Sequence, residues 1–189
     1  NTLAFGAHKR ELFSEIGAYD EEMVCNQDDE FNYRAIQAKK KIFMDPSIVT
    51  QYFSRSTFKN LFKQYFNYGF YKVRVIQKRQ ELFSLRHIIP SIFVLAVLFS
   101  LLEGYFSQNP LIAFSVILLY LLINSIISIF LATKFLLVPL LCLSFCILHF
   151  SYGIGFIMGL VLFCFKWHHN DIRDLNFNIE KFISNKRVL

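Results

Sequence analysis

Apolar residues divide the chain into a mixed N-terminal part, a long apolar part and a short polar tail. Residues 1–86 mix charged and apolar side chains, whereas residues 88–165 are almost entirely Leu, Ile, Phe, Val and Ser. The pattern predicts membrane-spanning helices at residues 85–106 and 111–131, because about 20 apolar residues cross the hydrocarbon core. Residues 135–165 are too long for one crossing and short for two, so we expect a tight or re-entrant hairpin that breaks near residues 149–153. The apolar region 85–165 thus contains three or four segments.

The N-terminal part shows alternating strand and helix signals. We expect a strand or loop at residues 2–6 and a short helix at 8–16, which Gly17 ends. A second helix is expected at residues 29–38, followed by strands at 42–44 and 48–53. This pattern predicts an α/β domain over residues 1–55.

Residues 56–84 predict an amphipathic helix next to the membrane. Ser56 and Thr57 are suitable N-terminal caps. The apolar positions that follow at helical spacing are Phe58, Leu61, Phe62, Tyr65 and Phe66. Basic and aromatic residues on one helix favour a position in the plane of the membrane surface. The alternative is a helix that faces the core of the N-terminal domain, and the adjacent span favours the membrane surface.

Composition and charge support a membrane protein. The chain has 189 residues, of which 54% are hydrophobic, and its mean hydropathy of +0.40 is too high for an ordinary soluble domain. The formal net charge is +6. Basic residues gather between the acidic residues near position 28 and the first span: Lys59, Lys63, Lys72, Arg74, Lys78, Arg79 and Arg86. Such a segment suits an anionic cytoplasmic leaflet, and its place beside an apolar stretch argues against nucleic acid as a partner.

The basic residues also predict the orientation. The segment before the first span, Lys134 and the basic tail at residues 166–189 should be cytoplasmic, whereas the loop at 103–110, which has no Lys or Arg, should lie outside. We therefore expect a multi-pass protein of the inner (plasma) membrane with its polar part in the cytoplasm.

The four cysteines predict no metal site and no disulfide framework. Cys142, Cys146 and Cys164 lie in apolar runs, where cysteine behaves as a small hydrophobic residue. No His or carboxylate joins them at metal-ligand spacing.

Three consecutive carboxylates form the candidate reactive segment. Asp28, Asp29 and Glu30 stand at an expected loop-to-helix junction, where acidic residues suit the positive end of the helix dipole. Carboxylates there could accept a proton. The alternative is a solvated helix start with an i,i+4 ion pair between Glu30 and Arg34.

Four motifs resemble family 2 glycosyltransferases. Residues 6–21 resemble the Gly…Arg…Gly-Gly-Phe-Asp-Glu stretch of that family, and residues 27–34 resemble its Glu-Asp-x-(Asp/Glu)-Leu-x-x-Arg motif. Residues 64–69 resemble the interfacial Gln-x-x-Arg-Trp element of processive members. Together with His-x-Ser-Tyr-Gly-x-Gly-Phe at residues 149–156, they are most similar to exopolysaccharide enzymes of the succinoglycan-biosynthesis type.

The resemblance implies a fold and roles for several residues. The fold would be the C-terminal half of a GT-A-like α/β domain, followed by transmembrane helices. Asp28 would be the general base, Asp29 and Glu30 would orient it or hold the acceptor, and Arg34 would brace the helix. The residues implied to contact the acceptor or the diphosphate group are Gln64, Tyr65, Tyr68, Arg34, His8 and Arg10. The partners would be a nucleotide-sugar donor, a lipid-linked or glycan acceptor and membrane lipids.

Departures from the family pattern limit this expectation. Gln27 replaces the usual Glu before the base, and Ala18 replaces the second glycine of Gly-Gly. Asn67-Tyr68 stands where processive enzymes have Arg-Trp, which favours a single-addition enzyme. No Asp-x-Asp follows a strand upstream of Asp28, so we expect the donor-binding half, with the ligands of its Mg²⁺ or Mn²⁺ ion, to lie outside this chain. The chain alone is not expected to bind donor.

The leading hypothesis is a membrane-anchored, inverting glycosyltransferase that acts on a lipid-linked acceptor. The rival is a non-catalytic membrane scaffold whose small acidic domain binds another protein.

Two features of the apolar region have structural interpretations that need no ligand. Gly153, Gly155 and Gly159 suit close packing of membrane helices. His149 should be neutral and hydrogen-bonded, or face a cavity.

Overall fold

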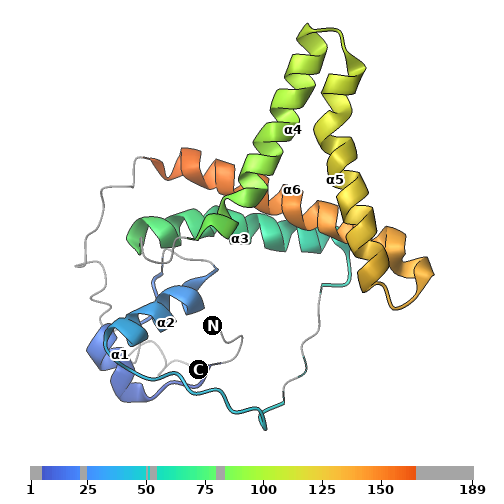
Figure 1. The fold of residues 1–189 in the computed structure, drawn as a ribbon. Helices are drawn as coiled ribbons and strands as arrows, with labels where there is room; N and C mark the ends of the chain where they lie inside the picture. The colour runs from blue at the N-terminus through green and yellow to red at the C-terminus, as the bar shows by residue number, and fades with distance from the viewer. Residues whose placement is uncertain (1–5, 22–24, 50, 52–54, 80–83, 165–189) are drawn as a thin grey trace.

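The structure, a computed structural model, describes residues 6–21, 25–49, 51, 55–79 and 84–164 (Figure 1). Its helices are α1 (Arg10–Ile16), α2 (Gln27–Gln37), α3 (Phe58–Lys78), α4 (Ile89–Phe106), α5 (Pro110–Leu131) and α6 (Val138–Leu162). Two short 3-10 helices, η2 (Leu85–His87) and η3 (Phe135–Leu137), precede α4 and α6. The expected strand or loop at residues 2–6 and the tail at 166–189 lie almost wholly outside the described residues.

The predicted α/β fold is wrong for the part of the chain that the structure describes, which contains helices and no strand. The predicted strand at residues 42–44 and the described residues of the one at 48–53 have no neighbouring strand in the described part of the chain to accept their backbone hydrogen bonds, and residues 50, 52 and 53 lie outside that part. Phe43 and Val49 are 83% and 86% exposed. Asp45 instead forms a turn, because its carboxylate accepts hydrogen bonds from the backbone N–H and the hydroxyl of Ser47. The described ranges therefore contain no GT-A-like sheet.

The expected helix boundaries of the N-terminal part are close to those observed. Gly17 ends α1 with a φ of 82°, which glycine adopts without steric cost. The hydroxyl of Thr57 caps α3 by accepting a hydrogen bond from the N–H of Asn60. The signals at helix ends are local, so they were predictable without knowledge of the tertiary packing.

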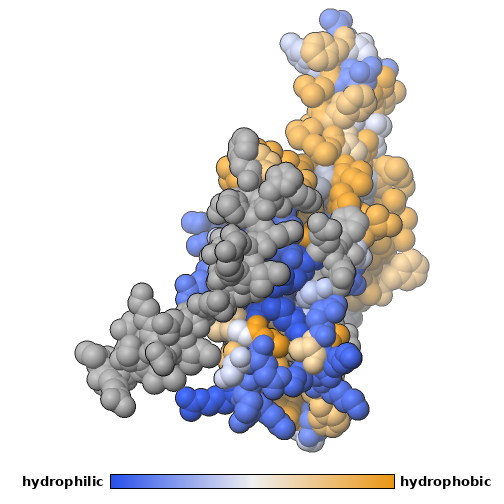
Figure 2. Space-filling view, turned by 90° about the vertical axis from the view of Figure 1, so that its left-hand side faces the viewer, coloured by the Kyte–Doolittle hydropathy of each residue, from blue (hydrophilic) through white to orange (hydrophobic). Residues whose placement is uncertain are grey.

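Within the described ranges, three helical segments are long and apolar enough to cross a membrane: Ile89–Phe106, Pro110–Leu131 and Phe135–Leu162. Helices α4 and α5 form a hairpin that projects from the rest of the molecule (Figure 1). The expected break at residues 149–153 is wrong, because α6 is continuous from Val138 to Leu162. On the face that Figure 2 shows, apolar residues predominate along the hairpin below its hydrophilic tip, and hydrophilic residues gather at the opposite end of the molecule.

Glycines bring α3 and α6 into backbone contact along their length (Figure 1). A Cβ added to Gly155 would lie 2.1 Å from the carbonyl oxygen of Phe66, and one added to Gly69 would lie 2.2 Å from that of Tyr152. Gly159 similarly faces Phe70. The interpretation of the late glycines as helix-packing residues is confirmed.

The two halves of α3 have different surroundings. In the N-terminal half of α3, Phe58 and Phe62 are 38% and 41% exposed. Residues 72–77 are buried in its C-terminal half, between α6 and the N-terminal helices. The exposed half retains the aromatic face expected at a membrane surface, and the buried half corresponds to the core-facing alternative.

Candidate functional site

The start of α2 is attached to the middle of α3. The side-chain amide of Asn26 donates a hydrogen bond to the carbonyl oxygen of Tyr68 at 3.2 Å. The thiol of Cys25 donates to the carbonyl oxygen of Asn67 at 3.3 Å. These contacts bring the acidic motif at residues 27–34 next to the Gln-x-x-x-Tyr motif at residues 64–68, which are well separated in sequence.

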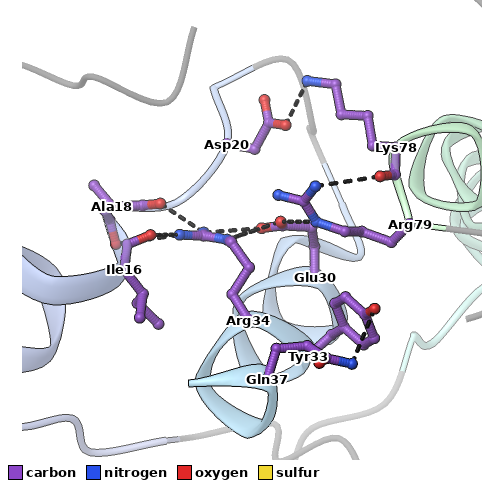
Figure 3. A network of polar contacts seen from close by, with 10 residues as sticks. Ile16, Ala18, Asp20, Glu30, Tyr33, Arg34, Gln37, Lys78 and Arg79 are labelled. Atoms are coloured by element: carbon purple, nitrogen blue, oxygen red, sulfur yellow. Dashed lines mark hydrogen bonds and ion pairs between the residues drawn. The ribbon is translucent and has the colours of Figure 1, made fainter. Parts of the chain in front are cut away.

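Asp29 and Glu30 are both neutralised by basic residues. The carboxylate of Asp29 lies 2.8 Å from the Nζ atom of Lys72 on α3. Glu30 has no exposed surface, and it accepts hydrogen bonds from Arg34 at 2.8 Å and from Arg79 at 3.1 Å (Figure 3). A buried carboxylate is stable only when it is paired and hydrogen-bonded, which both guanidinium groups provide.

Arg34 connects three parts of the N-terminal region. Besides Glu30, its guanidinium donates hydrogen bonds to the carbonyl oxygens of Ile16 and Ala18, at the end of α1 (Figure 3). Lys78 forms an ion pair with Asp20 in the same network. Arg34 is thus placed to brace α2 against the turn after α1, and only 8% of it is exposed.

Asp28 differs from its two neighbours. It is half-buried in the first turn of α2, and among the described residues it has no hydrogen-bond or ion-pair partner. Burial, with the nearby Asp28 charge as a second cause, raises the pKa of the Tyr19 hydroxyl and raises that of the Cys25 thiol to about 11. Cys25 is therefore protonated at neutral pH and is not a nucleophile. The Asp28 carboxylate, in contrast, is accessible in part and is not held by any described residue.

The α3 residues form a small polar and aromatic group beside the start of α2. The side-chain amide of Gln64 donates to the hydroxyl of Tyr68 at 2.8 Å. The rings of Tyr65 and Tyr68 meet edge to face with centroids 5.5 Å apart. All three side chains are half-buried, so each retains some accessible surface.

The remaining two candidate residues have other surroundings. His8 lies in an aromatic cluster, with its ring centroid 4.8 Å from that of Phe31 and 6.0 Å from that of Phe13. Arg10 is the first residue of α1 and is exposed. In the part of the chain that the structure describes, no hydrogen bond or ion pair joins Arg10 to α2 or α3.

Sequence reasoning did not identify the basic partners of the carboxylates. The sequence suggests that the basic residues before the first span face an anionic lipid leaflet. In the structure, three of them form ion pairs instead: Lys72 with Asp29, Lys78 with Asp20, and Arg79 with Glu30. The available signal was charge balance, because three carboxylates near a helix start need cations close by. Spacing could not identify which cations, since the pairs join residues that are 43, 58 and 49 positions apart.

The described residues offer no metal site. No group of three or more His, Cys, Asp or Glu side chains in the described ranges could hold an ion. The carboxylates of Asp29 and Glu30 are engaged with Lys72, Arg34 and Arg79, and a cation would have to displace these groups. The part of the chain that the structure describes therefore does not fit a divalent cation.

Two curated proteins are similar to the chain. It is 27% identical over 160 residues to the dolichyl N-acetyl-alpha-D-glucosaminyl phosphate 3-beta-D-2,3-diacetamido-2,3-dideoxy-beta-D-glucuronosyltransferase of Methanococcus voltae, a match to 84% of this chain and 48% of that protein. It is 34% identical over 80 residues to succinoglycan biosynthesis protein ExoA of Rhizobium meliloti, which covers 42% of this chain and 24% of that protein.

No protein-family model and no solved structure matches the chain. The chain spans about half the length of the Methanococcus relative and a quarter of ExoA. The similarity to a succinoglycan biosynthesis protein bears out the family that the motifs predicted. The chain is thus related to glycosyltransferases, consistent with a family 2 enzyme of exopolysaccharide synthesis.

Proposed function

We propose that the chain forms the acceptor-side and membrane-anchoring part of an inverting glycosyltransferase. The enzyme would transfer a sugar from a nucleotide-sugar donor to a lipid-linked acceptor during synthesis of an exopolysaccharide or another cell-surface glycan. The related proteins support this class of reaction, since one is named a transferase that acts on a dolichyl phosphate sugar and the other a succinoglycan biosynthesis protein.

One observation supports Asp28 as the general base. Of the three consecutive carboxylates, Asp29 and Glu30 have basic partners and Asp28 has none among the described residues. A base must be free to accept a proton, and a carboxylate already held by a guanidinium group or an ammonium group is poorly suited. In the proposed reaction the acceptor oxygen bonds to the anomeric carbon, Asp28 takes the hydroxyl proton, and the nucleoside diphosphate leaves.

The neighbouring residues would position the acceptor. Gln64, Tyr65 and Tyr68 contact one another on α3, and the carbonyl oxygen of Tyr68 holds the start of α2, so these residues could contact the acceptor or the diphosphate group. Arg34 and Glu30 would keep α2 in place through their buried ion pair. His8 and Arg10 would belong to the acceptor side, as the resemblance implies.

The membrane helices would place the reaction beside its substrate. A lipid-linked acceptor diffuses in the bilayer, and an anchored enzyme raises the frequency of productive encounters. We propose that the polar part lies in the cytoplasm and that the loop between α4 and α5 lies outside, because the basic residues are concentrated in the polar part. The donor site, and any Mg²⁺ or Mn²⁺ bound there, would be formed by residues outside this chain.

Replacement of Asp28 tests the proposal. We expect Asp28→Asn in the intact protein to abolish most sugar transfer while membrane insertion is retained. Asp45→Asn is the matched control, because Asp45 lies in an exposed turn. Transfer by Asp28→Asn at the wild-type rate would reject the catalytic role and favour a scaffold protein.

A further inference from the structure

Three helices meet where α6 passes the start of α4. The Tyr152 carbonyl oxygen on α6 lies against Gly69 of α3, since an added Cβ there would be 2.2 Å away. The next residue, Gly153, lies against the carbonyl oxygen of Pro90, 2.4 Å from an added Cβ. Tyr152 and Gly153 therefore bring the middle of α3 next to the first turn of α4.

Two cations lie at this junction. Lys72 follows Gly69 by about one turn of α3, is 9% exposed, and is held at 2.8 Å by Asp29. Arg86 belongs to η2, directly before α4, and it is exposed. Among the described residues Arg86 has no ion-pair or hydrogen-bond partner. Of these two cations, only Lys72 has an ion-pair partner among the described residues.

His87 adds an uncharged donor to the cations. Its Nδ1 atom accepts a hydrogen bond from the backbone N–H of Ser84 at 3.2 Å. Burial is the main cause that lowers the pKa of His87 to about 4, and the positive charges of Lys72 and Arg86 lower it further. At neutral pH the ring is uncharged, and because Nδ1 is an acceptor, its proton is on Nε2. The Nε2–H group can then donate to a further acceptor.

The position of these residues relative to the membrane limits what they could bind. Residues 85–87 directly precede the candidate span Ile89–Phe106, so Arg86 and His87 stand at the expected edge of the hydrocarbon. Asp29, which holds Lys72, is the neighbour of Asp28 in sequence. An anion bound here would be close both to the lipid surface and to the proposed base.

We infer that Lys72, Arg86 and His87, the junction cluster, bind the phosphate group that links the acceptor to its lipid. This inference rests on the proposed function and specifies how the acceptor is held. Arg and Lys are the preferred partners of phosphate oxygens, and a neutral imidazole N–H adds directionality. Asp29 holds the side chain of the buried Lys72 in position before the phosphate arrives.

Binding of a short lipid phosphate to the intact protein in detergent tests the inference. The probes are farnesyl phosphate, farnesol, inorganic phosphate and phosphatidylglycerol, measured by calorimetry on the wild type and three variants. The variants are Arg86→Gln, Arg86→Lys and Arg55→Gln, and the last removes an exposed arginine outside the cluster. Because Arg86 is exposed, its replacement should not unfold the protein.

We expect Arg86→Gln to weaken binding of farnesyl phosphate by about tenfold, the loss of one charge-assisted contact. Arg86→Lys should recover part of the affinity, and Arg55→Gln should bind as the wild type does. Farnesol should bind more weakly than farnesyl phosphate to the wild type, Arg86→Lys and Arg55→Gln. The difference between the two affinities should be smaller in Arg86→Gln.

Three results would overturn the inference: unchanged affinity in Arg86→Gln, equal losses in Arg86→Gln and Arg55→Gln, or equal binding of farnesol and farnesyl phosphate. Tight binding of inorganic phosphate alone, or of phosphatidylglycerol, would instead assign the cluster to a free anion or to a bulk lipid. Failure here is separable from failure of the proposed function. Asp28→Asn should retain farnesyl phosphate binding but lose transfer, whereas Arg86→Gln should raise the KM for the acceptor and leave kcat largely intact.

Discussion

Glu30 shows how a single buried charge organises the N-terminal helices. Its side chain has no exposed surface and contacts Arg34 from its own helix and Arg79 from the end of α3. Asp28, two residues earlier, is half-buried and has no such partner among the described residues. Adjacent carboxylates in one short motif therefore have different surroundings, which is the basis for assigning them different roles.

Glu30→Ala should destabilise the protein by about 3 kcal/mol, because it leaves two largely buried guanidinium groups without their counter-charge. Thermal unfolding in detergent measures this. The control is Glu15→Ala, which removes the exposed ion pair with Lys40 and should cost about 0.5 kcal/mol. Equal effects of the two substitutions would show that Glu30 is not a structural residue.

His87 should make stability depend on pH. Its ordinary pKa is 6.5 and its folded pKa is about 4, so between these values the unfolded chain binds a proton that the folded protein does not. Stability should therefore fall as the pH is lowered from 6.5 toward 4, and His87→Gln should reduce this fall. Thermal unfolding of both proteins at pH 7.5 and 5.5 measures the difference, and parallel behaviour would contradict the assigned burial of His87.

At the scale of elements, the contact between α3 and α6 depends on residues without side chains. The middle of α3 could not pack this closely if Gly155 or Gly159 had a Cβ atom, since each faces a backbone carbonyl of α3. Polar contacts join α5 to α6: Tyr120 bonds to His149 at 2.9 Å and Asn124 donates to the carbonyl oxygen of Cys142 at 3.0 Å. The expectation of a hydrogen-bonded His149 is confirmed.

Gly155→Leu should separate α3 from α6 and lower the stability by about 2 kcal/mol through overpacking. Met158→Leu, on an exposed part of the same helix, should have little effect. Thermal unfolding compares them, and a second readout is proteolysis of α3, which should be faster only in the glycine variant. Wild-type behaviour of Gly155→Leu would mean that the helices do not touch there.

The prediction of the helices was correct and that of the strands was wrong for the described residues, and the difference has a physical reason. Helix signals are local: Gly17 and Thr57 act on their own helix ends, and the apolar period of α3 is present in its own sequence. A strand requires a partner elsewhere, and residues 42–49 have the composition of strands without a neighbour in the described chain. Continuity of α6 was also missed, because the length of residues 135–165 exceeds one crossing and so suggested a break, whereas packing against α3 supports a helix there.

The candidate site was predictable only in part. The motif containing Asp28 and the motif containing Tyr68 were both identified from sequence, and the structure brings them together through Asn26. The cations that pair with the carboxylates come from α3 and could not be assigned from spacing, because each pair joins distant positions. His87 gave no signal, since its pKa depends on burial between helices.

At the scale of the whole molecule, the face in Figure 2 is mainly apolar along the α4–α5 hairpin and mainly hydrophilic at the opposite end. The α4–α5 hairpin presents apolar side chains such as Phe99 and Leu119, and the N-terminal helices present charged ones. This separation fits insertion of the hairpin into a bilayer with α2 near its surface. In the proposed orientation α2 is cytoplasmic.

Cysteine labelling in intact cells tests the orientation. A cysteine at Gln108, in the loop between α4 and α5, should react with a membrane-impermeant maleimide added outside. One at the exposed Ser56, before α3, should react only after the membrane is permeabilised. Both are made in a variant whose native cysteines are replaced by serine or alanine, and the reversed pattern would invert the topology.

The central claim is that Asp28 accepts the proton of a lipid-bound acceptor, and the most direct measurement is the rate of sugar transfer in Asp28→Asn at saturating acceptor. The account predicts a fall in kcat of about 10³-fold, in the usual range for loss of a general base, with acceptor KM within about twofold of wild type. Asp45→Asn should keep the wild-type kcat. A kcat for Asp28→Asn close to that of the wild type, in a protein that is folded and inserted, would contradict the role of Asp28 as the general base.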